Sequence, residues 1–347
     1  MAVLEKAKIY GVDKVGSSNP SALERTDSAV GLNVTVGASE IHSDFNRCYP
    51  WSDMEEVVDE YGNVFIKIPK FYAKITKNAD GTYKHQISGA RHDGFTTLFV
   101  DGKGNEIDYV LVGKYEGSGT ADRIYSKAGQ TVLVNLTIAQ YRTGCMANGE
   151  GYQQYDFLID LIIKELWLIE MKTTDSQSIM KGNTENDAAV DTGRTDTVAT
   201  ASGSEVSNTD AMHACKYRGI ENPFGNVYKW VDGISFNGTK VYVCFDPMAY
   251  KSEDYNPPYF YQGETPQDGG YVKTVAPLGK HPLIQYITEY TYDSGYYSDN
   301  AATFGTVLYA GGAWFVYGDA GLWVWDGGDD ASSFGSSIGG RLCYKPL

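Results

Sequence analysis

The residue types that most often carry catalysis or bind a metal are few in this sequence and widely spaced. The five histidines have no HExxH motif and no other close ligand spacing: His42, His85, His92, His213 and His281. The five cysteines form no CxxC pair, and their odd number does not favour a disulfide framework: Cys48, Cys145, Cys215, Cys244 and Cys343. The sequence has no GxSxG motif, and "GSGT" at residues 117–120 lacks the GK of a phosphate-binding loop. We therefore expect structural histidines and buried free thiols, with no catalytic residue and no transition-metal centre.

One short stretch, "DGGDD" at residues 326–330, concentrates side chains that suit a hard cation. Carboxylate oxygens are ligands for calcium, but this stretch does not match the DxDxDG loop with its distal Glu. A solvated acidic loop is the simpler interpretation. The expectation is therefore no cofactor, with calcium as the alternative.

Composition excludes several classes of partner. The chain has 347 residues, 42% of them hydrophobic and 21% charged, enough for one large or two ordinary globular domains. Its formal net charge of −15 argues against a nucleic-acid partner, because affinity for phosphate comes from clustered Lys and Arg. The first residues, "MAVLEKAKIYGVDK", lack the pattern of a signal peptide. Charged residues interrupt the most apolar stretch, residues 152–178, too often for a bilayer span, so we expect no membrane insertion.

The elements that would position any site alternate between strands and helices. Apolar residues in 152–178 recur at a spacing of three and four, which predicts a helix with one packed face, and a weaker helix is expected over 136–149. Alternation from Val64 to Ile75 predicts a strand, and Pro69 within it suggests an edge or a bulge. Residues 181–211 have almost no large apolar side chains and are expected to form a long exposed loop or a polar surface excursion. Two helices in a strand-rich chain indicate an α+β fold.

A motif in the second half of the chain carries a first resemblance. In "IENPFGNVYKWVDGI", residues 220–234, Gly225 permits a sharp turn, Asn226 can hydrogen-bond backbone across it, and Tyr228 and Trp230 alternate toward a core. The segment is similar to the "GNVWEW" signature of the C-type-lectin-like fold found in formylglycine-generating enzymes. The motif itself is interpreted as structural, with Gly225, Asn226 and Trp230 as scaffold.

A second resemblance rests on the order of several segments between residues 45 and 347: "CYPW", "GNVFIKIPKFYAKI", "LVGKYEGS", "YRTGCMANGEGY", "LWLIEMKTTDSQSIMKG", the motif above and the C-terminal stretch. In this order they resemble phage and prophage tail proteins whose C-terminus is varied by a diversity-generating retroelement, a group that includes the major tropism determinant. The resemblance implies a C-type-lectin-like fold with two helices, short twisted strands and long loops. It would place a β-rich N-terminal region at 1–115, packed on or part of the main domain, and a lectin-like domain at 116–347, with a variable face at 313–337.

The resemblance also implies which C-terminal residues vary. Such elements mutate template adenines, mostly in AAY codons, which yield every residue except Trp, Gln, Glu, Lys and Met. Residues 313–337 contain no Gln, Glu, Lys or Met, and all their negative charges are Asp. The positions expected to vary and to face outward are Ala313, Phe315, Val316, Tyr317, Asp319, Val324, Asp326, Asp329, Asp330, Ser333, Ser336 and Ser337. The positions expected to be buried, fixed scaffold in this region are Trp314, Leu322, Trp323, Trp325 and Ile338.

The resemblance implies a ligand-binding protein without enzymatic activity. Its partner would be a protein or glycan of a host-cell surface, together with other tail proteins, and its location a phage virion or a prophage-encoded extracellular particle. Monomer and homotrimer both remain open. A fixed structural tail or baseplate component is the first alternative. The second, an enzyme related to the formylglycine-generating group, would use Cys343, although "GGRLCYKP" lacks the paired active-site cysteine spacing of those enzymes.

Overall fold

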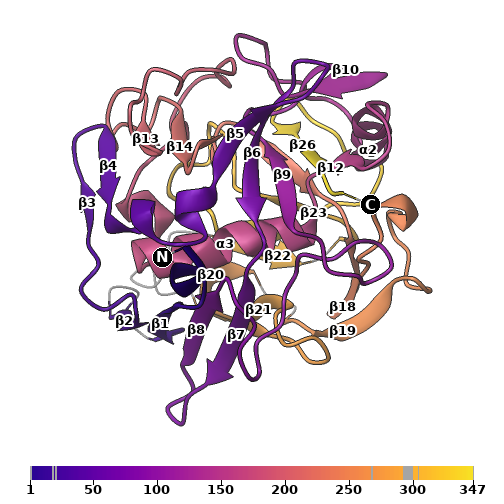
Figure 1. Cartoon of the computed structure of the whole chain (residues 1–347). Helices are drawn as coiled ribbons and strands as arrows, with labels where there is room; N and C mark the ends of the chain where they lie inside the picture. Colours follow the sequence, from indigo (N-terminus) through magenta and orange to yellow (C-terminus); the bar gives the residue numbers. More distant parts are fainter. Residues whose placement is uncertain are drawn as a thin grey trace.

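The computed structural model describes residues 2–17, 19, 22–266, 269–291, 300–303 and 305–346, and these form an α+β fold (Figure 1). The described α-helices are α1 (Ala2–Lys6), α2 (Ile138–Met146) and α3 (Phe157–Met171). The short 3-10 helices are η1 (Asp44–Arg47), η2 (Trp51–Asp53), η3 (Ser176–Ser178), η4 (Pro247–Ala249) and η5 (Tyr317–Asp319). None of the described helices is long and apolar enough to cross a membrane.

The strands form several small, mostly antiparallel sheets around α3. A four-stranded sheet has the order β2 (Glu24–Asp27), β1 (Ile9–Val15), β8 (Tyr83–Ser88) and β7 (Tyr72–Lys77). A five-stranded sheet has the order β15 (Ile220–Glu221), β14 (Cys215–Tyr217), β13 (Ser202–Ser204), β4 (Glu40–Ser43) and β3 (Val34–Val36). Smaller sheets pair β10 (Ser118–Thr120) with β11 (Arg123–Tyr125), and join β17 (Ile234–Asn237), β18 (Lys240–Val243) and β19 (Phe260–Glu264).

A second five-stranded sheet combines strands from the first half of the chain with its last strand. Its order is β12 (Tyr152–Gln154), β26 (Leu342–Tyr344), β9 (Tyr109–Gly113), β6 (Val64–Pro69) and β5 (Glu55–Val58). The strand β26 therefore lies between β12 and β9, and Cys343 pairs with Gln153 on one side and Val112 on the other. Strands on both sides of residue 115 thus share one hydrogen-bonded sheet.

The sheet that carries the C-terminal segment has seven strands. Their order is β21 (Gln285–Thr291), β20 (Gly270–Pro277), β22 (Asn300–Thr303), β24 (Trp325–Gly327), β23 (Leu308–Ala310), β16 (Tyr228–Val231) and β25 (Ile338–Gly339). The strand β16 contains the second half of the "GNVYKW" motif and pairs with β23 and with β25. This pairing places residues 311–337 next to the "GNVYKW" motif.

The helix α3 forms as expected from the sequence but is buried all round, not on one face only. Figure 1 shows it crossing the middle of the molecule. Asp156 caps its first turn by accepting a hydrogen bond from the backbone N of Ile159 at 2.8 Å, and Lys172 ends it in a left-handed conformation. Its charged residues are compensated inside the protein: Asp160 by Lys164, Glu165 by His85 and Glu170 by Arg218. A helix with charges on several sides can be fully buried because each charge meets a partner.

The predicted helix over 136–149 is also confirmed, as α2, and Thr137 and Gln140 form a capping box at its start. The prediction for Pro69 was wrong. The strand β6 ends at Pro69 and lies between β9 and β5, and the chain then crosses to another sheet, where β7 begins at Tyr72. Proline is tolerated there because it is the last residue of its strand.

The prediction that residues 181–211 form an exposed loop was only partly right: the segment is mostly loop and many of its residues are exposed, but β13 lies within it and parts of it turn inward. Several polar side chains of this segment are fully buried, including Asn183, Thr184 and Thr195. Thr195, for example, donates a hydrogen bond from its hydroxyl to the buried carboxylate of Glu221 at 2.8 Å. The segment is polar because it fills the interior with hydrogen bonds instead of apolar contacts.

Asp160 offers a test of how strongly the fold depends on the buried charges of α3. Its carboxylate accepts hydrogen bonds from Lys164 Nζ at 2.5 Å, Trp325 Nε1 at 2.7 Å and Tyr155 Oη at 3.0 Å. We expect Asp160→Ala to lower the free energy of unfolding by about 3–5 kcal/mol, measured by urea denaturation, because it breaks a buried ion pair. Asp101→Ala, at an exposed turn, is the control and should cost no more than about 1.5 kcal/mol. Equal losses for the two variants would contradict the prediction.

Candidate ligand-binding face

Residues 313–337 form two surface loops on either side of β24. We call the surface formed by residues 314–319, Asp326 and residues 328–337 the candidate face. The first loop connects β23 to β24 and contains η5. The second loop leads from β24 to β25, where Ile338 pairs with Tyr228. Both loops therefore approach β16 from its two neighbours in the sheet.

The backbone of the first loop is held by groups that lie outside residues 313–337. Trp314 N donates to Asn226 O at 3.0 Å, and Asn186 N donates to Trp314 O at 2.7 Å. Tyr317 N donates to Thr184 O at 2.9 Å. The side-chain amide of Gln177 donates to the carbonyl oxygens of Tyr317 and Ala320, at 2.8 and 2.6 Å. Main-chain bonds of this kind do not depend on which side chains the loop carries.

Gly225 and Asn226 form the turn against which this loop rests. Both have left-handed backbone conformations, with φ of 72° and 62°. A Cβ on Gly225 would lie 2.9 Å from Asn183 O, so this position requires glycine. The Asn226 side chain accepts from Asn183 Nδ2 at 2.9 Å and Val190 N at 2.8 Å, and it donates to the carboxylate of Glu116. The sequence predicted backbone hydrogen bonding by Asn226, and the backbone partner is Val190, from a distant segment.

The second loop is anchored at its beginning by Asp329 and Glu253. Asp329 O accepts from Thr306 N at 2.8 Å, and its carboxylate accepts from Tyr309 Oη, also at 2.8 Å. Glu253 accepts from Ala331 N at 3.2 Å and from Thr306 Oγ1 at 2.8 Å. The rest of the loop, with Phe334 64% exposed, faces outward.

The two loops meet at a pair of tyrosines in the sheet. The rings of Tyr228 and Tyr309 pack edge to face with centroids 4.6 Å apart. Burial raises the pKa of Tyr228, and the negative charges of Asp326, Asp319 and Asp329 raise it further. None of the three carboxylates takes part in a described ion pair. The candidate face thus combines aromatic rings with negative charge.

The structure places most of the expected variable residues at the surface. The exposed ones are Phe315, Tyr317, Asp319, Asp330 and Ser336, and the partly exposed ones are Val316, Asp326, Asp329, Ser333 and Ser337. Of the expected scaffold residues, Leu322, Trp323, Trp325 and Ile338 are buried, as are Gly225, Asn226 and Trp230. Trp325 stacks on Tyr286 with centroids 4.9 Å apart and an interplanar angle of 13°.

Three expectations about burial were wrong. Ala313 and Val324 do not face outward but are buried, with 0% and 2% exposed surface. Each lies at the base of the first loop, where Val316 N donates to Ala313 O and Gly311 N donates to Val324 O. Trp314 is only partly buried, because its two backbone hydrogen bonds hold it within the surface loop, where its ring packs on Phe315 at 4.8 Å.

Sequence reasoning missed several residues of this surface. Tyr309 and Glu253 lie outside the C-terminal window, and no local pattern identifies them. Tyr228 had been read only as a core residue, yet it is partly exposed at the point where the loops meet. Phe334 could have been included among the positions expected to vary, since a Phe codon can arise from AAY by changes at its two adenines.

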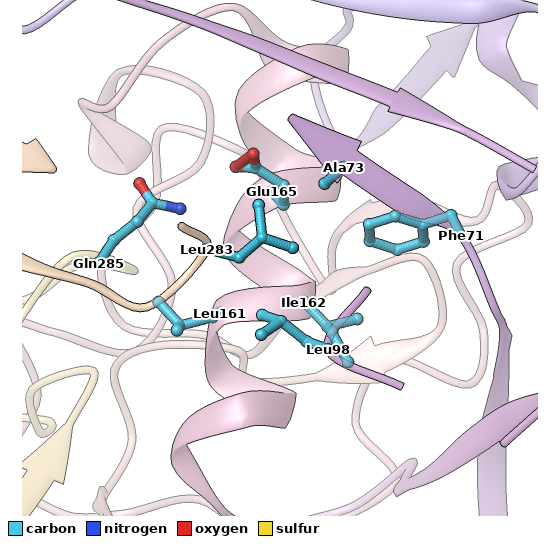
Figure 2. A pocket seen from close by; sticks show the side chains of 8 residues that line it. All are labelled: Phe71, Ala73, Leu98, Leu161, Ile162, Glu165, Leu283 and Gln285. Atoms are coloured by element: carbon cyan, nitrogen blue, oxygen red, sulfur yellow. The ribbon is translucent and has the colours of Figure 1, made fainter. Parts of the chain in front are cut away.

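The largely apolar cavity shown in Figure 2 is too small for an organic ligand. The cavity in Figure 2 has a volume of about 10 Å³, room for about one water molecule, and Glu165 and Gln285 are its polar lining residues. The described residues contain no group of three or more His, Cys, Asp or Glu side chains that could hold a metal ion. All five cysteines are free and buried, as predicted, and burial raises the pKa of Cys343 to about 12. A thiol of this kind is protonated at neutral pH.

Asp326 should make stability depend on pH in a direction opposite to that of a typical surface aspartate. Burial raises its pKa, and the nearby Asp329 carboxylate adds to this effect. A raised folded-state pKa means that the folded protein binds the proton more tightly than the unfolded chain, so stability falls as pH rises through and above about 4. We expect Asp326→Asn to raise the melting temperature at pH 7, and the gain to shrink toward pH 4.

Asp330→Asn is the matched control for Asp326→Asn. The hydroxyl and backbone N of Ser332 hydrogen-bond to the Asp330 carboxylate and lower its pKa. This carboxylate therefore contributes stability above its unfolded pKa, and its loss should lower the melting temperature slightly at pH 7. Shifts of the same sign in the two variants would contradict the assignment.

Asn226 should control the order of the first loop. We expect Asn226→Gly, which retains the left-handed backbone, to cost at least about 2 kcal/mol in the free energy of unfolding because buried partners lose their hydrogen bonds. Asn226→Ala should cost about 1 kcal/mol more, because alanine disfavours this backbone conformation. Hydrogen exchange of the amides of residues 314–320 should accelerate in both variants. Unchanged exchange would show that the loop is held independently of Asn226.

Comparison with known proteins adds no family assignment. No protein-family model matches the chain, and no curated protein matches it. What can be said of its function therefore rests on the candidate face and on the resemblance in the order of its motifs.

Proposed function

We propose that this chain is a ligand-binding protein without enzymatic activity, which displays a retroelement-diversified surface on a C-type-lectin-like scaffold. The candidate face is its binding site, and a protein or glycan of a host-cell surface is its ligand. By the same resemblance, the chain acts in the tail of a phage or of a prophage-encoded particle.

The observation that carries this proposal is the way the first loop is held. Its backbone bonds to Asn226, Asn186, Thr184 and Gln177, all outside the segment expected to vary. Phe315 and Tyr317 project from this loop with 42% and 61% of their surface exposed. A site that must accept many sequences needs a backbone that is positioned independently of them, with side chains free to contact a ligand.

The exposed side chains suit recognition. Aromatic rings supply contact area at low entropic cost, and the aspartates select partners by charge. The enzyme alternative receives less support, because the buried thiol of Cys343 is not accessible to a substrate. A fixed structural tail component remains the competing function, since exposed loops alone do not require a ligand.

The DNA that flanks the gene distinguishes these functions. We expect a near-copy of codons 311–340 that differs from the gene almost only at adenines, together with a reverse-transcriptase reading frame. The differing codons should fall on exposed positions such as Phe315, Tyr317 and Asp319, and not on Trp323 or Trp325. If sequencing finds no such copy, the proposal of a diversified face is overturned and a fixed component is favoured.

Tolerance to substitution gives a second test, which needs only the purified protein. Simultaneous replacement of Phe315, Tyr317 and Asp319 by serine should change the free energy of unfolding by no more than about 1 kcal/mol, because exposed positions contribute little. The matched core change Leu322→Ala should cost about 2–5 kcal/mol. A loss in the triple variant comparable to that of Leu322→Ala would contradict a role as a variable surface.

A further inference from the structure

A fully buried lysine of β16 lies against the turn formed by Gly225 and Asn226. Lys229 is 3% exposed, and its Nζ donates a hydrogen bond to Gly225 O at 2.7 Å. Its counter-charge is the carboxylate of Glu116, which is also fully buried and whose Oε1 lies 3.3 Å from Nζ. A buried ion pair is costly to desolvate and is weak evidence for stability. Stability alone therefore does not account for a lysine at this position.

The same carboxylate also contacts a buried side-chain amide. Nδ2 of Asn222 donates to Glu116 Oε2 at 3.0 Å, and Asn222 has no exposed surface. Glu116 therefore holds the amine of Lys229 at one oxygen and the carboxamide of Asn222 at the other. Its Oε1 has no hydrogen-bond partner among the described residues, which leaves this oxygen available to accept a proton from Nζ.

The surroundings prepare the amine and the carboxamide to react with each other. Burial lowers the pKa of Lys229 to about 8, although the charge of Glu116 opposes this effect. The neutral amine, which is the nucleophilic form, is therefore accessible near neutral pH. The side-chain oxygen of Asn222 accepts a hydrogen bond from Cys215 N at 3.3 Å. A donor at this oxygen stabilises the negative charge that develops there when an amine adds to the carboxamide carbon.

We propose that Lys229 and Asn222 form an intramolecular isopeptide bond, with Glu116 as the catalytic acid and base. The bond from Nζ to Cγ forms, the bond from Cγ to Nδ2 breaks, and one molecule of ammonia leaves. Glu116 takes a proton from Nζ and returns one to Nδ2, so the step needs no oxidant and no further reactant. The fold supplies the driving proximity, because it holds all three groups together in the interior.

Asn226 also donates to Glu116 but is the poorer acceptor for this reaction. Its Nδ2 donates to Val190 O as well, and its Oδ1 accepts from Asn183 Nδ2 and Val190 N. Loss of the Asn226 amide nitrogen would break the bond to Val190 O, whereas the described hydrogen bond of Asn222 Nδ2 is the one to Glu116. A link between Lys229 and Asn222 would thus close the turn covalently and leave the anchor of the first loop intact, whether or not the candidate face varies.

Mass spectrometry of the full-length wild-type chain, under denaturing conditions, tests the proposal. We expect a mass lower than that of the sequence by one ammonia. Trypsin should fail to cleave after Lys229, and the resulting peptide 219–240 should carry the deficit and give no backbone fragments between residues 222 and 229. Asn222→Ala removes the acceptor and Glu116→Gln the acid–base group, so each should restore the full mass of its sequence and the cleavage after Lys229.

Asn237→Ala is the matched control, because it removes an exposed asparagine that precedes a glycine. Ring closure at such a pair also releases ammonia, but this variant should keep the deficit in peptide 219–240. The proposal is overturned if the wild-type chain has its full mass, if the deficit persists in Asn222→Ala, or if Lys229 is joined to another residue. The first measurement uses the wild-type chain, so its outcome does not depend on whether Glu116→Gln folds.

Discussion

The hydrogen bonds of Asn226 are the interactions on which the organisation of the candidate face depends. Its side chain is fully buried and bonds to Glu116, Asn183 and Val190, which come from separate parts of the chain. The backbone oxygen of Asn226 accepts a hydrogen bond from the backbone N of Trp314, at the start of the first loop. Asn226 therefore ties two internal segments together through its side chain and holds the start of the candidate face through its backbone oxygen. Because the side chains of Asn226, Asn183 and Glu116 are fully buried, losing any one of them leaves another unsatisfied.

Buried charged side chains in the interior also bond to partners from distant parts of the chain. The buried carboxylates of α3 join it to β8 through a hydrogen bond with His85, and to β14 through an ion pair with Arg218 and a hydrogen bond with Tyr217. Arg341, which is 2% exposed, donates to carbonyl oxygens of Gly113 and Asn222 at 2.7 and 3.1 Å. Directional bonds of this kind specify one arrangement of the sheets more strictly than apolar contacts alone, which tolerate repacking.

Much of the local structure could be predicted from the sequence. Periodicity identified α2 and α3 but not the ends of α3, because the apolar stretch 152–178 extends beyond Phe157–Met171 on both sides. The exposure of Phe315 and Tyr317 and the burial of Trp323 and Trp325 were expected from the resemblance, and the structure has them so. Long-range partners could not be predicted. No local sequence pattern indicates that parts of residues 181–211 turn inward, since a polar composition normally marks a surface loop. No local pattern indicates that Tyr309 and Glu253 lie beside the candidate face either. These features depend on strand order, which a single sequence does not encode in any short pattern.

The position of β26 has a consequence for which loop sequences allow the chain to fold. This strand lies between β12 and β9, yet it follows both loops of the candidate face in the chain. The sheet that contains β26 is therefore completed only after the loops have been synthesised, and an intervening sequence that obstructs β26 leaves β12 unpaired and one edge of β9 open. Exposed strand edges promote aggregation and degradation. If the loops vary as proposed, folding would remove those surface sequences that prevent β26 from pairing.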